Sequence, residues 1–170
     1  MRTIRMAILL TLVPGMLGAE TPSRKPMEGV WKVAAVVVTG ANPENTPNPQ
    51  PGLIIFGQKH YSMMWIRGDQ ARAPYAAEEP TNEEKIKAFE SFTASTGTYE
   101  VSGSAMTVWP MVARNPNFMS GGSSRYEFRA EGDTLWLTQK STDARYRIAG
   151  KVGPPTRAAS ETRLKLTRLE

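Results

Sequence analysis

The stretch GVWKVAAVVV, residues 29–38, begins with a Gly-x-Trp motif and continues as a run of small and β-branched residues. Side chains alternate between the two faces of a strand, so Trp31 and the alternate residues up to Val37 are expected on one face. Lys32 lies on the other face, and a lysine is rarely buried without a partner. Trp31 is therefore predicted to point into the core of a sheet.

Short stretches with strand composition recur along the rest of the chain, with turn-forming residues between them. They cover residues 53–56, 61–67, 98–101, 106–112, 124–130, 134–140, 144–150 and 162–170. Residues 39–52 contain four prolines and are expected to form a long loop outside the sheet. Because so large a sheet must protect its edges, we predict an all-β fold in which eight or nine antiparallel strands close into a barrel.

One segment has a helical period instead. In residues 81–95, TNEEKIKAFESFTAS, apolar residues recur every third position from Ile86 to Phe92, and Thr81 and Glu84 have the spacing of a capping box. This pattern predicts one helix of about 13 residues. We expect its apolar stripe to cover the open end of the barrel.

The first residues have the layout of a secretory signal peptide. Residues 1–19 contain two arginines, then an apolar stretch, then small residues, and the apolar stretch is too short to span a bilayer. A buried N-terminal helix is the alternative, which the two arginines disfavour. Residues 20–27 are polar and are expected to be a disordered lead-in. The prediction is a secreted or periplasmic protein with one barrel domain over residues 28–170 and no transmembrane segment after removal of the signal peptide.

Composition excludes several classes of site. The 170 residues carry a net charge of +5, and removing a leader with its two arginines leaves 19 basic residues against 16 acidic ones, about +3. Basic residues are interspersed with acidic ones, which predicts no nucleic-acid partner. The absence of cysteine excludes thiol catalysis, and His60 is the single histidine, in a predicted turn. We predict no metal, no cofactor and no catalytic residue.

Aromatic, methionine and arginine side chains on the inward positions form the candidate ligand-binding set. Its members are Tyr61, Met63, Trp65, Arg67, Phe89, Tyr99, Tyr126 and Phe128. They would line a cavity for an apolar molecule, with tyrosine hydroxyls to orient it, or fill a solid core in which methionine occupies the gaps. Arg67 and Glu100 are either an acid–base or substrate-clamping pair of a barrel enzyme or two solvated residues at strand ends.

Several motifs occur in a characteristic order: GVWKV, GLIIFGQKHYSMMWIR, the helix leading into ASTGTYEV, NPNF and SRYEFRAEGDTLWLT. Together they resemble the bacterial lipocalin-like domain family, over residues 28–140 and more loosely over the final strand. The resemblance implies a small calycin-type barrel in which Trp31 packs across the closed end. It also implies that Arg168, which shares the inward parity of the last strand, lies over the Trp31 ring as a cation–π pair. TVWPMV, residues 107–112, departs from the polar residues usual in that strand of the family.

These observations predict a barrel that binds a small, largely hydrophobic molecule between the proline-rich loop, the helix and a loop at residues 115–122. One alternative is a small barrel enzyme of the isomerase or cyclase type that acts on a hydrophobic substrate. The other is a packed barrel that binds a protein partner in the cell envelope. An apolar cavity favours binding, convergent ionisable groups favour the enzyme, and a filled interior with an exposed apolar patch favours the protein partner.

Overall fold

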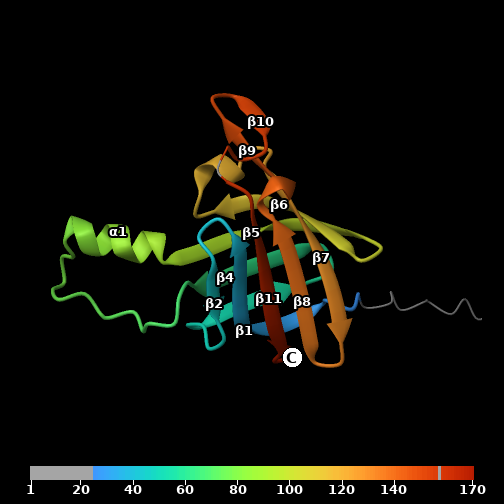
Figure 1. Ribbon diagram of the computed structural model, residues 1–170, viewed down its shortest axis with the longest axis horizontal. Helices are drawn as coiled ribbons and strands as arrows, with labels where there is room; N and C mark the ends of the chain where they lie inside the picture. Colours follow the sequence, from blue (N-terminus) through green and yellow to red (C-terminus); the bar gives the residue numbers. More distant parts are fainter. Residues whose placement is uncertain (1–24, 157) are drawn as a thin grey trace, which may run out of the picture.

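The computed structural model describes residues 25–156 and 158–170. The predicted signal peptide, residues 1–19, lies outside the described residues, as does most of the predicted lead-in. The described chain is mostly β-sheet, with one α-helix, α1 (Asn82–Glu90), and two short 3-10 helices, η1 (Pro116–Phe118) and η2 (Ser141–Asp143). Figure 1 shows the strands gathered into one body with α1 beside it.

Eight strands close into an antiparallel barrel. In spatial order they are β1 (Gly29–Gly40), β3 (Gly52–Phe56), β4 (His60–Ile66), β5 (Phe92–Ser102), β6 (Ala105–Ala113), β7 (Ser123–Glu131), β8 (Thr134–Lys140) and β11 (Ser160–Arg168). The ring is complete because β7 pairs with β8 and β11 pairs with both β8 and β1. In Figure 1, β1, β11 and β8 cross β4 and β5 steeply, as the strand tilt of a barrel requires. The predicted closed all-β barrel is confirmed.

Three further strands lie outside the ring. β9 (Ala144–Ile148) and β10 (Lys151–Gly153) form a hairpin joined to β7, and β2 (Glu44–Thr46) pairs with β1. The expectation that the proline-rich loop stays out of the sheet is therefore wrong at β2. The physical reason is local: residues 44–46 contain no proline, so their amides can pair with β1.

A β-bulge in β1 changes which side chains face inward. The register with β11 shifts between Val33 and Ala35. Trp31 and Val33 are buried as predicted, but beyond the shift Val36 is buried while Val37 is only half-buried. The predicted inward positions beyond Val33 are wrong, because the extra residue of a bulge moves the alternation of the strand by one.

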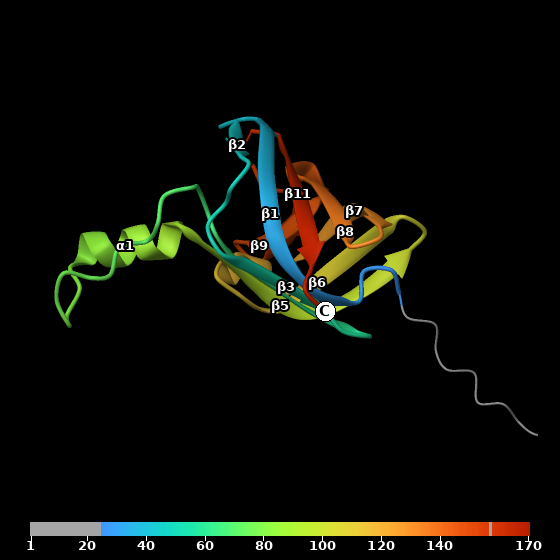
Figure 2. The same cartoon turned by 90° about the horizontal axis from the view of Figure 1, so that it is seen from below.

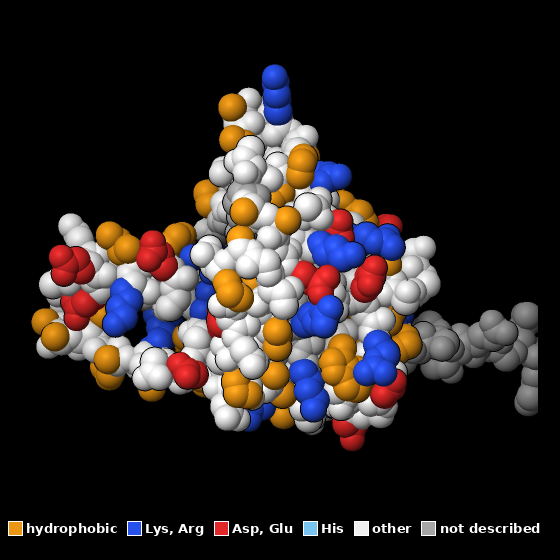
Figure 3. Space-filling model, in the orientation of Figure 1, with side chains coloured by type: hydrophobic (Ala, Val, Ile, Leu, Met, Phe, Trp, Pro, Cys, Tyr) orange, Lys and Arg blue, Asp and Glu red, His pale blue; other side chains and the backbone are white. Residues whose placement is uncertain are grey.

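Helix α1 is shorter than predicted and does not cover the end of the barrel. The capping box is present, with the Thr81 amide donating to the Glu84 carboxylate at 2.8 Å and the Glu84 amide to Thr81 Oγ1 at 3.2 Å. Strand β5 begins at Phe92, directly after the cap of α1, so the helix extends outward from the start of that strand (Figure 2). Ile86 and Phe89 are each 56% exposed. Figure 3 shows α1 and the preceding loop as a lobe with charged side chains of both signs on its surface.

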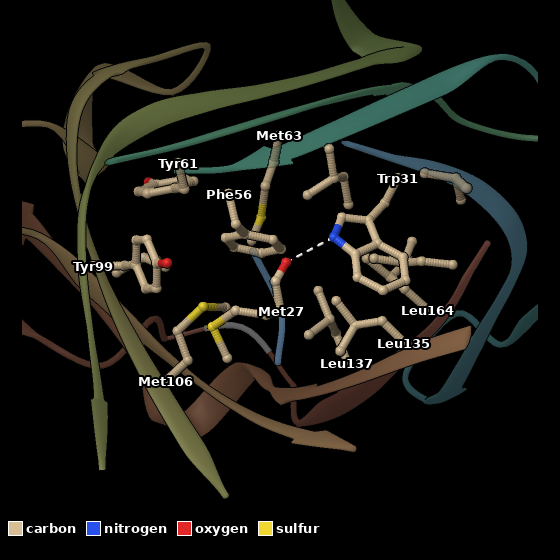
Figure 4. Packing of buried hydrophobic residues seen from close by; sticks show 14 of the residues in the cluster. Met27, Trp31, Phe56, Tyr61, Met63, Tyr99, Met106, Leu135, Leu137 and Leu164 are labelled. Atoms are coloured by element: carbon tan, nitrogen blue, oxygen red, sulfur yellow. Dashed lines mark hydrogen bonds between the residues drawn. The ribbon is translucent and has the colours of Figure 1, made fainter. Parts of the chain in front are cut away.

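Apolar side chains fill one end of the barrel. Met27 is fully buried and lies among Phe56, Met106 and Trp31, and its carbonyl oxygen accepts a 2.7 Å hydrogen bond from Trp31 Nε1 (Figure 4). Residues 25–27 therefore belong to the fold and not to a disordered lead-in. The lead-in prediction is wrong for these residues because the Met27 side chain completes the core.

Candidate functional site

At its closed end the barrel is sealed by the Trp31 and Arg168 pair that the family resemblance implied. The guanidinium carbon of Arg168 lies 4.0 Å from the centroid of the Trp31 ring. Arg168 also donates hydrogen bonds to the carbonyl oxygens of Glu28 at 2.9 Å and Pro26 at 3.3 Å, and its Nε lies 3.7 Å from the Asp133 carboxylate. These partners compensate the half-buried positive charge of Arg168, which lies on an apolar surface. The closed end is therefore a structural element that stabilises the fold.

The opposite end contains a cavity of about 190 Å³. It lies where β4 ends and β5 begins, and side chains from β4, β5, β6, β7, β8, β9, β11 and the η1 segment line it. The lining residues are Met63, Trp65, Arg67, Thr93, Ala94, Ser95, Ala113, Arg114, Asn115, Phe118, Ser124, Tyr126, Gln139, Tyr146, Thr162 and Leu164. The interior of the barrel is therefore filled at one end and hollow at the other.

A second cavity of about 330 Å³ adjoins the first. The two share Trp65, Arg67 and Thr162, and the second extends along β1 towards Asn42 and Glu44. The proline-rich loop and the η1 segment thus reach the open end, as expected. Helix α1 contributes no lining residue to either cavity.

Polar side chains form one wall of the first cavity. Ser124 on β7 is buried, and its hydroxyl oxygen has no hydrogen-bond partner among the described residues. Tyr126 is its neighbour on the same face of β7, although no hydrogen bond of normal geometry joins the two hydroxyls. Ser95, on β5, is hydrogen-bonded to the buried Tyr61 hydroxyl at 2.6 Å. The cavity therefore offers at least one unused buried hydroxyl to a bound molecule.

The buried phenols of this region remain neutral at physiological pH. Burial raises the pKa of Tyr61 to about 12, although the Ser95 hydrogen bond acts in the opposite direction. Burial also raises the pKa of Tyr126, and the nearby phenols of Tyr61 and Tyr146 raise it further, against a smaller effect of Ser124. Such phenols donate and accept hydrogen bonds but do not act as general bases near neutral pH.

Two arginines lie at the mouth of the first cavity. Arg67 follows the end of β4, and its Nε donates a 3.1 Å hydrogen bond to Thr93 Oγ1. Arg114 follows β6, donates through Nη1 to the carbonyl oxygen of Phe89 at 2.8 Å, and places its guanidinium carbon 4.9 Å from the Phe89 ring centroid. Arg114 therefore contacts α1 and lines the cavity as well.

Four of the eight predicted ligand-binding residues meet at the cavity, and four do not. Met63, Trp65, Arg67 and Tyr126 line it. Tyr61, Tyr99 and Phe128 pack into the core, where the Tyr99 hydroxyl donates to the Gly57 carbonyl oxygen at 2.6 Å. Phe89 lies on α1 and does not line the cavity, because the helix does not fold over the barrel end; its ring contacts the cavity residue Arg114 instead.

Arg67 and Glu100 do not form an acid–base pair. The pairing of β4 with β5 sets Ile66 opposite Phe92 and His60 opposite Thr98. Arg67 therefore follows one end of this pair of strands, whereas Glu100 lies beyond its other end. The structure therefore gives no support to a joint role of Arg67 and Glu100.

Several residues of the cavity are not among the eight predicted ones. Three of them follow the alternation of inward-facing residues along a strand, past the last apolar residue: Ser124 on β7, Gln139 on β8 and Thr162 on β11. This alternation could have identified them from the sequence. Arg114 and Tyr146 come from segments outside the predicted inward positions, and no local pattern identifies them.

Within residues 25–156 and 158–170, no group of three or more His, Asp or Glu side chains is placed to hold a metal ion. Over the same part of the chain, no helix is long and apolar enough to cross a membrane.

A sequence model of the lipocalin-like domain matches residues 28–152, which run from the turn before β1 to the β9–β10 hairpin. No curated protein matches the chain. The match covers most of the sequence and agrees with the eight-stranded antiparallel ring and with the Trp31 side chain packed across one end. The chain belongs to the lipocalin-like domain family.

Proposed function

We propose that the protein binds a small molecule in the cavity at the open end of the barrel. The observation that carries this proposal is the Ser124 hydroxyl, which is buried in the cavity wall without a hydrogen-bond partner among the described residues. Leaving a buried hydroxyl unpaired costs about 1–3 kcal/mol. A polar atom of a bound molecule would remove this cost.

The size and lining of the cavity support a small amphipathic ligand in place of a largely hydrophobic one. Volumes of about 190 Å³ and 330 Å³ suit a compact molecule, because typical ligand pockets measure roughly 300–1,000 Å³. Met63, Trp65 and Leu164 supply an apolar wall, and Ser124 and Tyr126 supply hydrogen-bonding groups. Binding is favoured over the packed-barrel alternative, since the open end is hollow.

The test combines native mass spectrometry of the protein purified from its own host with NMR titrations of the mature protein. Octanoate and octan-1-ol serve as probes. A co-purified small molecule, or shifts of the Trp65 and Ser124 amide signals that saturate with either probe, would support the proposal. If no molecule co-purifies and neither probe perturbs these signals, the proposal is wrong. Shifts confined to the outer face, for example at Trp136, would also contradict it.

We further infer that the protein is exported, to the periplasm or the medium. The support is the arrangement of residues 1–19, with two arginines before an apolar stretch and small residues after it. Mass spectrometry of the protein from its host should find an N-terminus at or within a few residues of Glu20. An intact N-terminus on protein from the cytoplasmic fraction would refute export.

A further inference from the structure

We propose that the ligand is a small organic acid whose carboxylate binds to Arg114 and Arg67 at the mouth of the cavity. This inference rests on the proposed function, because it names the chemical class that the same cavity accepts. Its basis is the charge of the lining: among the described residues, the wall of the first cavity includes two arginines and no aspartate or glutamate.

Arg114 is held in place but retains unused donors. Its hydrogen bonds to described residues, to the carbonyl oxygens of Phe89 and Glu90, both use Nη1. The stacking of the guanidinium on the Phe89 ring fixes its plane. Nε and Nη2 are therefore left to bind an anion. A planar guanidinium with two available donors matches the two oxygens of a carboxylate.

Arg67 brings a second positive charge to the same space. It lines both cavities, and the hydrogen bond from its Nε to Thr93 Oγ1 anchors the side chain to β5. Its backbone amide also donates to the Ser91 carbonyl oxygen at 2.8 Å, which ties the end of β4 to the segment between α1 and β5. The second cavity, which Arg67 also lines, includes Glu44, whereas both arginines and no carboxylate line the first, so an anion is favoured over a neutral molecule in the first cavity.

The carboxylate position leaves the apolar part of the acid facing inward. The apolar part of the wall includes Trp65 and Met63 on β4 and Leu164 on β11, and Met63 and Leu164 also belong to the packed core. An acid with a short apolar body would therefore bury the body against these side chains and keep its charge at the mouth. A neutral alcohol of the same length would gain the apolar contacts and hydrogen bonds between neutral groups, but no charge-assisted hydrogen bonds from both arginines.

The experiment compares octanoate with octan-1-ol by isothermal titration calorimetry. The wild type should bind octanoate about tenfold or more tightly than octan-1-ol, because hydrogen bonds to a charged group are worth more than those to a neutral one. Arg114→Ala should weaken octanoate binding about tenfold and change octan-1-ol binding by less than about twofold. Arg67→Gln should act in the same direction. Added salt should weaken octanoate binding only.

Two further variants separate the role of the cavity arginines from the effect of removing any arginine or of disturbing the side chains near the cavity. Arg125→Ala removes an exposed arginine from the outer face of β7 and should leave octanoate binding unchanged. Phe89→Ala removes the ring that positions the Arg114 guanidinium while keeping both arginines, so it should weaken octanoate binding less than Arg114→Ala does and leave octan-1-ol binding unchanged. Circular dichroism checks that each variant is folded, and Arg67→Gln tests the inference if Arg114→Ala is not.

The outcomes distinguish failure of the inference from failure of the proposed function. If both probes bind equally tightly, or if the arginine variants weaken both probes alike, the organic-acid inference is wrong and small-molecule binding stands. A loss of octanoate binding in Arg125→Ala equal to that in Arg114→Ala would also overturn the inference. If neither probe binds, the inference falls, and the proposed function falls with it unless a small molecule co-purifies with the protein.

Discussion

The two ends of the barrel use the same strands but different side chains. Three cross-strand rows on the inner faces of β8 and β11 show the change: Leu135 lies opposite Leu166, Leu137 opposite Leu164, and Gln139 opposite Thr162. The first row is fully buried, the second borders the cavity, and the third lines it. The closed end thus supplies the buried apolar area that stabilises the fold, and the open end is left to polar groups that contribute little to it.

Trp31→Ala should produce the largest loss of stability, because it empties the centre of the closed end. Deleting a fully buried tryptophan side chain costs about 3–5 kcal/mol, and here the stacking partner of Arg168 is lost as well. Urea denaturation measures the change in the free energy of unfolding. Trp136→Ala is the matched control on the outer face, where the ring stacks under Arg129, and it should cost no more than about 1 kcal/mol. If the two variants lost the same free energy of unfolding, the closed end would not stabilise the fold more than the outer face does.

Gly97→Ala should have the next largest effect, since Gly97 lies between the two ends, at the register shift between β5 and β6. A Cβ atom there would lie 2.1 Å from the Trp109 carbonyl oxygen and 2.8 Å from the Met111 amide nitrogen. Both contacts are with backbone, so a strand must shift, at a cost of about 1–3 kcal/mol. Gly57→Ala, whose Cβ would meet only the His60 carbonyl oxygen at 3.6 Å, should be nearly neutral by the same denaturation measurement. A tolerated Gly97→Ala would contradict the close approach.

Raised pH should destabilise the protein through the phenols buried near the boundary of the two ends. Burial raises the pKa of Tyr61 to about 12, from about 10 in an unfolded chain, so the folded state holds this proton more tightly. The stability from the neutral phenol is fully present below about pH 10 and is lost as the pH rises towards 12. Denaturation midpoints measured from pH 8 to 12 should therefore fall less steeply for Tyr61→Phe than for the wild type. Parallel curves for the two proteins would refute this role of Tyr61.

The closed end was largely predictable from sequence because it depends on local alternation. Trp31 with Lys32 beside it, and the inward leucines of β8 and β11, follow the period of two that a strand imposes. The alternation failed beyond Val33, where a bulge shifts it. The sequence at this position contains no glycine or proline to mark the bulge.

The open end was less predictable because its residues depend on packing between distant segments. The amphipathic pattern of α1 predicted a helix correctly but not its position, which follows from the pairing of β5 with β4 up to Phe92. Arg114 and Tyr146 reach the cavity only through the path of the η1 segment and the β9–β10 hairpin. Ser124 lies on the same inward face of β7 as Tyr126, but a serine side chain has neither the size nor the apolar character that marks a residue as a candidate ligand contact.

Ser124→Ala should have the smallest effect on stability, and its sign sharpens the contrast between the two ends. The hydroxyl is buried and makes no hydrogen bond of normal geometry with a described residue, so removing it relieves a desolvation cost and gives up only its small effect on the Tyr126 phenol. We expect the free energy of unfolding to stay within about 1 kcal/mol of the wild type or to rise. Ser141→Ala is the matched control, because the Ser141 hydroxyl accepts a 2.9 Å hydrogen bond from the Ser160 amide and its loss should destabilise. If Ser124→Ala destabilised the protein as much as Ser141→Ala, Ser124 would be a structural residue. The open end would then contribute to the stability of the fold as the closed end does.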